Sequence, residues 1–178
     1  MSNWTSSPAA PTPTESLAMT VASPLGMLTV TEVAGALVRL SWWDRAVAKA
    51  PTRLLAEAAR QLAAYFEKRL KDFDLPLRPA GSLFQQAVCL AMCRIPARTT
   101  RSNGAIAAEL GAPAPARAVG GACGSNPIPI IIPCHRILAT GGALGGYSGE
   151  GGAETRRFLL ALEGAEAADA VPRQMRLL

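Results

Sequence analysis

Three consecutive residues, Cys134, His135 and Arg136, carry side chains that can support nucleophilic chemistry. A cysteine becomes a useful nucleophile when a nearby base or cation favours its thiolate, and His135 is the only histidine in the chain. Neighbouring side chains on a regular strand point to opposite faces, so Cys134 and His135 can cooperate only if the chain bends between them or a water bridges them. We therefore predict a turn or a helix start at residue 134. The alternative is a buried structural cysteine beside a solvated histidine.

The segment before the thiol, NPIPIIIP, is suited to holding it rigidly. Asn126 before Pro127 favours a turn, and Ile130 to Ile132 are predicted to form a short buried strand. Pro133 cannot donate to a sheet ladder, so this strand should stop immediately before Cys134.

The other cysteines, Cys89, Cys93 and Cys123, add no metal or disulfide signature. No CxxC pair is present, so we expect no metal site. Nothing in the sequence indicates secretion, which favours free thiols. Cys89 and Cys93 lie four residues apart on one predicted helix, and we interpret both as small buried hydrophobic residues rather than as a redox pair.

Two short helices are predicted over residues 103–110 and 115–123, separated by the helix-breaking stretch GAPAP. Such a pair is typical of a helix-turn-helix, whose second helix can enter a DNA groove, although it also occurs in proteins that never bind DNA. The charged residues from 82 to 136 are Arg94, Arg98, Arg101, Glu109, Arg117 and Arg136. This excess of arginine predicts a basic surface for a polyanionic partner, with a solvated face lacking any ligand as the alternative.

The first 80 residues predict a separate α/β unit. Residues 1–18 are rich in Ser, Thr, Pro and Ala and are expected to form a disordered tail. Two strand-like runs flank an Ala34-Gly35 turn and predict an antiparallel hairpin. A strongly amphipathic helix follows, opened by Thr52, and a second one begins at Ser82 after a segment rich in proline and glycine. We place a domain boundary near residue 80.

Composition limits the class of protein. The chain has 178 residues, of which 49% are hydrophobic and 17% charged, enough to bury the core of one domain or of two small ones. No apolar run approaches the roughly 20 residues needed to cross a bilayer. The N-terminal residues lack the features of a signal peptide, so we expect a cytoplasmic protein without membrane contact. The net charge is +5, and arginine's excess over lysine suits contacts to phosphates and base edges, although genome composition would produce the same excess.

The string NPIPIIIPCHRIL, preceded by ARAVGGACGSN and followed by GALGGYSGEGGAETRRFLLALEG, closely resembles the active-site region of the methylated-DNA–protein-cysteine methyltransferases, the O6-alkylguanine-DNA alkyltransferases. The resemblance continues through FQQAV and IPARTTRSNGAIAAELG, and more loosely through SPLGMLTV and YFEKRLKDFDLPL. It implies an N-terminal α/β domain of ribonuclease-H-like fold with a supporting role, residues 19–80. The C-terminal domain, residues 81–165, would be mainly helical with a winged helix-turn-helix-like DNA-binding motif, and residues 166–178 would form a tail.

This resemblance implies DNA repair by direct, irreversible transfer of an alkyl group from O6-alkylguanine, and also from O4-alkylthymine, to Cys134. Each molecule would act once, as a monomer on double-stranded DNA, without a cofactor. His135 would take the thiol proton through a bound water, and Glu163 would orient His135. Asn126 would shape the turn beside the site.

The resemblance also implies contacts with the damaged base. Tyr147 and Ser148 match a lid over the extruded base, with Ser148 placed to bond guanine O6. The backbone carbonyls of Cys134 and Ile137 would accept from the guanine amino group. A stacked base cannot reach a cysteine inside a protein, so the nucleotide must be flipped out of the duplex.

Contacts with the DNA itself are implied for the second predicted helix. Arg117 matches the arginine that enters the stack and fills the vacated place, and Arg101 is a further candidate in the basic stretch. Small residues along this helix would permit close approach to the minor groove: Ala118, Gly120 and Gly121.

One departure from the family pattern is the segment RSNG, where Asn103 stands in place of the usual tyrosine. Asn103 can still donate a hydrogen bond to the base, but it lacks the ring and reach of tyrosine, which predicts weaker base extrusion. For this reason a non-catalytic sensor that binds alkylated bases is an alternative function. A thiol hydrolase that uses Cys134 and His135 for many turnovers is a second alternative.

Overall fold

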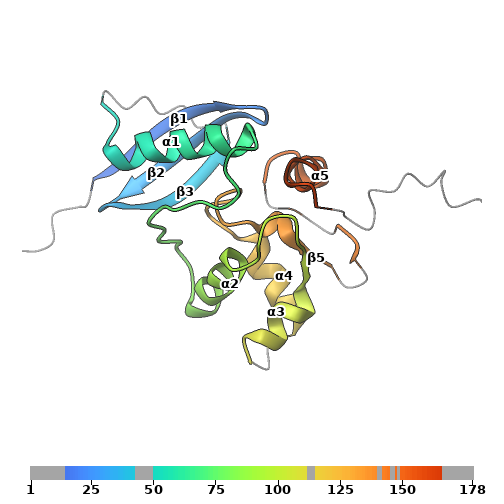
Figure 1. Cartoon of the computed structure of the whole chain (residues 1–178). Coiled ribbons are helices and arrows are strands. Elements are labelled where there is room, and N and C mark those ends of the chain that lie inside the picture. Colours follow the sequence, from blue (N-terminus) through green and yellow to red (C-terminus); the bar gives the residue numbers. More distant parts are fainter. Residues whose placement is uncertain are drawn as a thin grey trace, which may run out of the picture.

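The fold combines a small sheet covered by one helix with a mainly helical half that carries the Cys-His pair (Figure 1). The chain is described here from a computed structural model, which covers residues 15–42, 50–111, 115–139, 142–144, 147 and 149–165. Within these ranges, no helix is both long and apolar enough to cross a membrane.

Three antiparallel strands form the N-terminal sheet in the order β1-β2-β3. They are β1 (Ser16–Ser23), β2 (Gly26–Val33) and β3 (Ala36–Trp42). Ala34 and Gly35 join β2 to β3, and both have positive φ, 47° and 73°, as tight two-residue hairpin turns require. The predicted hairpin is therefore confirmed.

The first strand corrects the predicted tail. β1 begins at Ser16, so residues 16–18 belong to the sheet, and the prediction of a disordered tail over residues 1–18 was wrong for these three. The physical reason is pairing: Ser16 lies opposite Val33, and the register is continuous to Ser23 opposite Gly26. Composition alone does not reveal such a strand end, because its stability comes from the backbone ladder and from the neighbouring strand. Residues 1–14 of the predicted tail lie outside the described residues, and Glu15 is exposed and belongs to no strand or helix.

Helix α1 (Arg53–Phe66) packs over this sheet (Figure 1). Its start is confirmed, because the Thr52 hydroxyl accepts a hydrogen bond from the Leu55 amide at 3.0 Å. The apolar spacing buries one face of the helix against the sheet, including Leu55, Ala58, Leu62 and Tyr65. The helix ends at Phe66, and Lys68 then takes a positive φ of 60°.

Three helices make up most of the second half: α2 (Leu83–Cys93), α3 (Asn103–Glu109) and α4 (Ala116–Gly124). Ser82 and Gln85 form a reciprocal capping box at the start of α2, as the sequence predicted for Ser82. The predicted pair of short helices is also confirmed, and α4 packs against both α2 and α3. Cys89 is buried as expected, whereas Cys93 is exposed, which corrects its assignment to the core.

The segment from residue 126 to 133 forms a compact turn instead of the predicted strand. Ile130 has a positive φ of 74°, which interrupts any strand from Ile130 to Ile132. Asn126 stabilises this turn from both ends: its side-chain Nδ2 donates to the Ile132 carbonyl at 2.9 Å, and its Oδ1 accepts from the Ile128 amide at 3.0 Å. The three isoleucines are buried without being extended, so the apolar run marks the core rather than a sheet.

Two further elements follow the turn. A 3-10 helix, η1 (Cys134–Arg136), leads into the short strand β5 (Ile137–Leu138). The strand pairs in parallel with β4 (Arg101–Ser102), immediately before α3. The last described helix is α5 (Gly152–Glu163), which begins and ends at glycines with positive φ. The prediction of a turn or helix start at residue 134 is confirmed.

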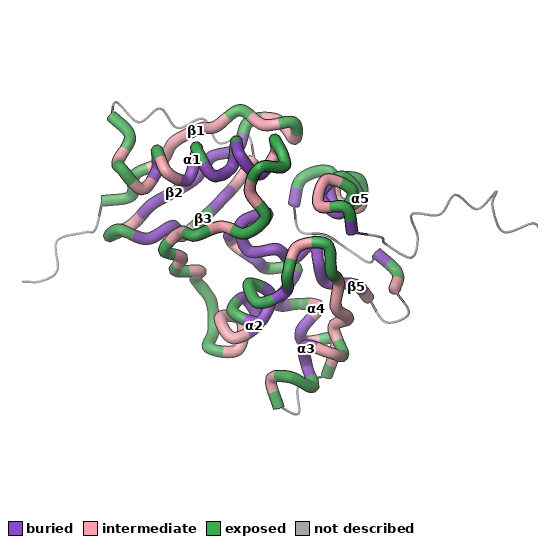
Figure 2. Tube along the Cα trace, in the orientation of Figure 1, coloured by how far each residue is buried: buried purple, intermediate pink, exposed green. Residues whose placement is uncertain are grey.

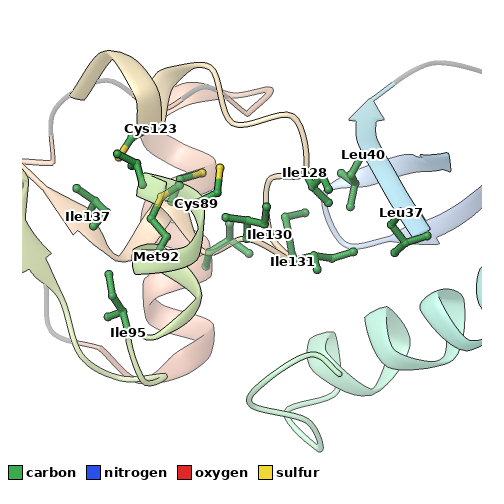
Figure 3. Packing of buried hydrophobic residues seen from close by; sticks show 14 of the residues in the cluster. Leu37, Leu40, Cys89, Met92, Ile95, Cys123, Ile128, Ile130, Ile131 and Ile137 are labelled. Carbon is green, nitrogen blue, oxygen red and sulfur yellow. The ribbon is translucent and has the colours of Figure 1, made fainter. Parts of the chain in front are cut away.

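Buried residues occur in both halves (Figure 2), and their side chains form one hydrophobic cluster that extends through both. The isoleucine turn joins them: Ile128 lies beside Leu40 of the sheet, while Met92 and Cys123 pack in the helical half (Figure 3). The Leu40 amide also donates to the Pro127 carbonyl at 2.9 Å. Because the core is continuous, the proposed division near residue 80 stays a prediction.

Candidate active site and nucleic-acid surface

Cys134 lies at the wall of a cavity of about 430 Å³ in the helical half. The bend into η1 places it there, because the Arg136 amide bonds back to the Pro133 carbonyl at 3.0 Å and turns the chain. The residue is only 3% exposed. We call this space the acceptor cavity; its lining is Asn103, Gly120, Cys123, Gly124, Cys134, Ile137, Leu138, Ala139, Leu144, Tyr147 and Arg156.

His135 is completely buried and is held by Glu163 of α5. The distance from His135 Nε2 to Glu163 Oε1 is 2.8 Å, so the carboxylate favours the tautomer with the proton on Nε2. That tautomer leaves Nδ1 as a lone-pair acceptor, and Nδ1 has no protein hydrogen-bond partner among the described residues. Burial lowers the pKa of His135 and outweighs the opposing influence of Glu163, so the ring is a neutral base at physiological pH.

Glu163 collects hydrogen bonds from three other side chains, and we call this group the carboxylate cluster: Tyr65, His135, Arg136 and Glu163. Burial alone would raise the pKa of Glu163, but the bonds from His135 and Arg136 outweigh it and lower the pKa to about 2. The carboxylate is thus charged at neutral pH although its side chain is only 3% exposed. Such a charge is tolerated because it is paired and fully hydrogen-bonded.

Arg136 binds the carboxylate in a fork, with Nη2 at 2.8 Å from Oε1 and Nε at 2.9 Å from Oε2 of Glu163. Its Nη1 donates to the Ile95 carbonyl at 2.6 Å. The sequence presented Arg136 as a local cation for the thiol. The structure instead directs its guanidinium at Glu163, so its effect on Cys134 passes through His135.

Tyr65 is the residue that sequence reasoning missed in this cluster. Its hydroxyl donates to Glu163 Oε1 at 2.8 Å, from helix α1 of the N-terminal half. Burial, assisted by the adjacent carboxylate, raises the pKa of Tyr65, so the hydroxyl remains a donor. The helical pattern identified Tyr65 only as a core residue, and no local signal connects it with a partner so distant in the sequence.

Arg156 of α5 was also missed. It lines the acceptor cavity and is only 4% exposed, with Nε 3.3 Å from the His135 carbonyl and Nη2 3.4 Å from the Cys134 carbonyl. These bonds support the backbone of η1. A signal was present in the sequence, because Arg156 falls on the apolar face of α5 with Leu159 and Leu160, where an arginine needs a buried partner.

The residues assigned to the base partly converge on the acceptor cavity. Asn103, Ile137 and Tyr147 all line it together with Cys134. Burial, and then the neighbouring Cys134, raises the pKa of Tyr147, so its phenol stays protonated. The Oδ1 atom of Asn103 is buried and has no hydrogen-bond partner among the described residues. Ser148 lies outside the described residues.

Asn126 does not line the acceptor cavity. Its two hydrogen bonds fix the isoleucine turn that leads to Cys134, which is the shaping role expected for it. Burial raises the pKa of the two other buried cysteines, to about 11 for Cys89 and to about 12 for Cys123. Both are therefore protonated and poorly nucleophilic at neutral pH.

The outer face of α4 carries the residues assigned to DNA. Arg117 is exposed, and a Cβ added at Gly121 would meet no atom within 4 Å, so a backbone could approach the helix there. Ala118 and Gly120 are half-buried. Arg101 differs from Arg117, because it forms an ion pair with Glu109, which α3 supplies.

No group of three or more His, Cys, Asp or Glu side chains that could hold a metal ion occurs within the described part of the chain. All four cysteines are free thiols.

Comparison with known protein families gives two matches that together span most of the described chain. Residues 17–79 match the model of the 6-O-methylguanine DNA methyltransferase ribonuclease-like domain. Residues 83–165 match the model of the 6-O-methylguanine DNA methyltransferase DNA binding domain.

Individual proteins agree with these matches. The chain is 44% identical over 150 residues to a methylated-DNA–protein-cysteine methyltransferase of Mycolicibacterium paratuberculosis, which covers 81% of this chain and 90% of that protein. It is 41% identical over 154 residues to the constitutive enzyme of that name from Bacillus subtilis, covering 81% and 93%. Among solved structures, Mycobacterium tuberculosis OGT in complex with DNA superposes with a TM-score of 0.72 at 42% identity, covering 83% of this chain and 94% of that one. An O6-methylguanine methyltransferase structure from the same species gives a TM-score of 0.74 at 40% identity, covering 87% and 97%.

Proposed function

Because the chain belongs to the 6-O-methylguanine DNA methyltransferase family, it is a DNA-repair protein that transfers an alkyl group to a cysteine, and we propose that this cysteine is Cys134. The observation that carries the proposal is that Cys134 lines the acceptor cavity and is directly followed, in the same 3-10 helix, by a buried histidine that Glu163 orients. Cys123 lines the same cavity, but its raised pKa disfavours the thiolate that the reaction needs.

The proposed reaction is a single displacement. The Cys134 thiol gives its proton to His135 Nδ1 through a bridging water, and the resulting imidazolium is stabilised by Glu163. The thiolate attacks the alkyl carbon on guanine O6, a carbon–sulfur bond forms, and the carbon–oxygen bond breaks. The electron pair of the broken bond stays with guanine, which takes up one proton from solvent. The products are unmodified guanine in DNA and an S-alkylated Cys134.

Each molecule is expected to react once, because a thioether resists hydrolysis and the reaction does not regenerate the thiol. No cofactor is needed in this scheme, since the alkyl group moves directly from base to protein. The proposed partner is double-stranded DNA that contains O6-alkylguanine. A monomeric state and a cytoplasmic location remain predictions from the sequence.

Access to the base requires that the nucleotide leave the stack, which costs a few kcal/mol. The exposed Arg117 side chain on α4 is suited to fill the vacated place, and the open space over Gly121 allows close approach of a DNA groove. Tyr147, Ile137 and Asn103 then surround the base in the cavity. Ser148 completes this proposed set of residues.

The direct test is mass spectrometry of the protein after incubation with a duplex that contains O6-methylguanine. We expect one methyl group per molecule, located on the peptide that contains Cys134. Cys134→Ser should abolish the gain, whereas Cys123→Ser, which removes the other thiol of the cavity, should retain it. A methyl group found on any other residue, or binding without transfer, would refute the assignment.

The same experiment separates the alternatives. A sensor of alkylated bases, suggested by Asn103 in place of tyrosine, would bind the duplex without gaining mass. A thiol hydrolase would release product in excess of protein. A second experiment compares the rate of methyl transfer by the native chain with that by Asn103→Tyr. If the asparagine weakens base extrusion, the variant should transfer faster. An unchanged rate would show that the asparagine does not weaken it.

A further inference from the structure

An unsatisfied polar atom lies in the wall of the acceptor cavity. The Oδ1 atom of Asn103 is buried and lacks a hydrogen-bond partner among the described residues, although the side chain lines the same cavity as Cys134. Buried polar atoms in native proteins are nearly always paired, so each exception calls for an explanation. By contrast, the carboxamide of Asn126 has a protein partner at both its oxygen and its nitrogen.

The backbone fixes the carboxamide of Asn103 near the thiol. Asn103 directly follows β4, which pairs with β5, and β5 directly follows η1. On the side of α4, Gly120 leaves room for it, because a Cβ there would lie 3.4 Å from Nδ2 and 4.0 Å from Oδ1 of Asn103. A larger residue at position 120 would press on the carboxamide, so the helix accommodates it without bonding to it.

A carboxamide offers a donor and an acceptor side by side. The minor-groove edge of guanine carries the complementary pair, an N3 acceptor beside the 2-amino donor, and alkylation at O6 leaves this edge intact. An O4-alkylated thymine presents only acceptors along its pairing and minor-groove edges, because alkylation removes its N3 proton. It would therefore leave the Asn103 oxygen without a partner.

We propose that Asn103 is a specificity-determining residue that accepts a hydrogen bond from the 2-amino group of the flipped guanine, so that the site favours O6-alkylguanine over O4-alkylthymine. The inference rests on the proposed alkyl transfer to Cys134 and adds the base that the cavity selects. A site built to hydrogen-bond a substrate group discriminates against analogues that lack it, because its own polar atom is then buried unpaired.

The backbone carbonyls near the thiol can share this amino group, but one of them already has a protein donor. Arg156 Nη2 lies 3.4 Å from the Cys134 carbonyl. The contribution of Asn103 must therefore be separated from that of the backbone, which a combination of substrate and protein changes can do.

The experiment compares rates of methyl transfer from duplexes with O6-methylguanine, with O6-methylhypoxanthine, which lacks only the 2-amino group, and with O4-methylthymine. Native protein should react roughly three- to ten-fold faster with O6-methylguanine than with O6-methylhypoxanthine, the effect of one neutral hydrogen bond. The rate with O4-methylthymine should be lower still. In Asn103→Leu, which has a similar shape but no hydrogen-bonding groups, the first two rates should converge.

The matched control is Leu144→Val, which changes the cavity wall without changing its hydrogen bonds. It is expected to alter both guanine and hypoxanthine rates alike and to keep their ratio. A ratio that is equally large in native protein and in Asn103→Leu would overturn the role of Asn103. No transfer from O6-methylguanine by native protein would instead refute the proposed function, so the two failures are distinguishable. Thermal unfolding of each variant verifies that it is folded.

Discussion

The two sides of the Cys134 thiol differ in how their polar groups are satisfied. In the carboxylate cluster, a single carboxylate receives hydrogen bonds from Tyr65, His135 and Arg136. In the wall of the acceptor cavity, Asn103 Oδ1 is buried and has no hydrogen-bond partner in the part of the chain that the structure describes. The two sides therefore have different tasks. The carboxylate cluster, in which Glu163 accepts hydrogen bonds from three side chains, holds His135 in one tautomer. The cavity wall keeps one hydrogen-bond acceptor that a bound base can pair with.

The largest effect should follow from removing the negative charge of Glu163 at the centre of the carboxylate cluster. Glu163→Gln removes the buried ion-pair partner of Arg136 and leaves it the exposed Asp72, 3.7 Å away, so we expect a loss of about 3–5 kcal/mol in the free energy of unfolding. Methyl transfer should also fall sharply, because His135 loses its orienting acceptor. Urea unfolding and the transfer rate measure both effects. Glu154→Gln, an exposed change on the same helix, is the control, and equal stability of the two variants would contradict the argument.

Acid should weaken the same cluster in two stages. The folded pKa of Glu163 is about 2 against an ordinary value of 4.5, so its contribution is present above pH 4.5 and is lost as the pH falls towards 2. The loss amounts to roughly 3 kcal/mol. The folded pKa of His135 lies below its ordinary 6.5, so folding also weakens as the pH drops below that value. Urea midpoints measured across this range should fall monotonically. In Glu163→Gln the stage below pH 4.5 should be reduced, and its full retention would contradict the assignment.

A smaller effect is expected from Tyr65→Phe. The variant loses one hydrogen bond to a charged group, which is worth about 1.5–3 kcal/mol. Without that donor, Glu163 Oε1 is a stronger acceptor for His135 and stabilises the imidazolium more, so the pKa of the imidazole should rise. The acid limb of the rate–pH profile should consequently move to higher pH, whereas the rates at alkaline pH should agree with the native protein. A loss of stability with an unchanged profile would reduce Tyr65 to a packing role.

The smallest effect concerns the cations of the DNA-facing side. Arg101 forms an ion pair with Glu109, while the exposed Arg117 side chain is available to DNA. The two arginines should therefore differ in their contribution to DNA binding. Arg117→Ala should weaken binding to undamaged duplex and lower its salt slope by about 1. Arg101→Ala should change the slope less. Equal slopes for the two variants would show that the ion pair does not shield Arg101.

Local rules predicted much of the fold, because helix starts and tight turns depend on neighbouring residues. Thr52 and Ser82 cap the starts of their helices as expected, and the chain turns at Cys134 as predicted. The isoleucine run shows the limit of these rules. Its β-branched residues predicted a strand, but the turn fixed by Asn126 gives Ile130 a positive φ and places the run in the core without an extended backbone.

The family resemblance predicted the site residues whose roles it supplied. It did not predict the residues that reach the site only through tertiary contacts. Glu163 was expected beside His135 and lies there. Tyr65 could not be found, because its partner is contributed by a distant helix and both residues fit ordinary helical patterns. Arg156 could have been suspected, since a charged residue on the apolar face of a helix has to be compensated.

The parallel pairing of β4 with β5 has a practical consequence for protein engineering. Arg101 lies opposite Ile137 and Ser102 opposite Leu138, so two residues of backbone ladder join the segment that follows Cys134 to the segment that leads into Asn103. The span between acceptor sulfur and carboxamide is therefore set by main-chain geometry. Variant libraries intended to accept bulkier alkyl groups can change Leu144 and Ala139, which line the acceptor cavity, without changing the residues of this ladder.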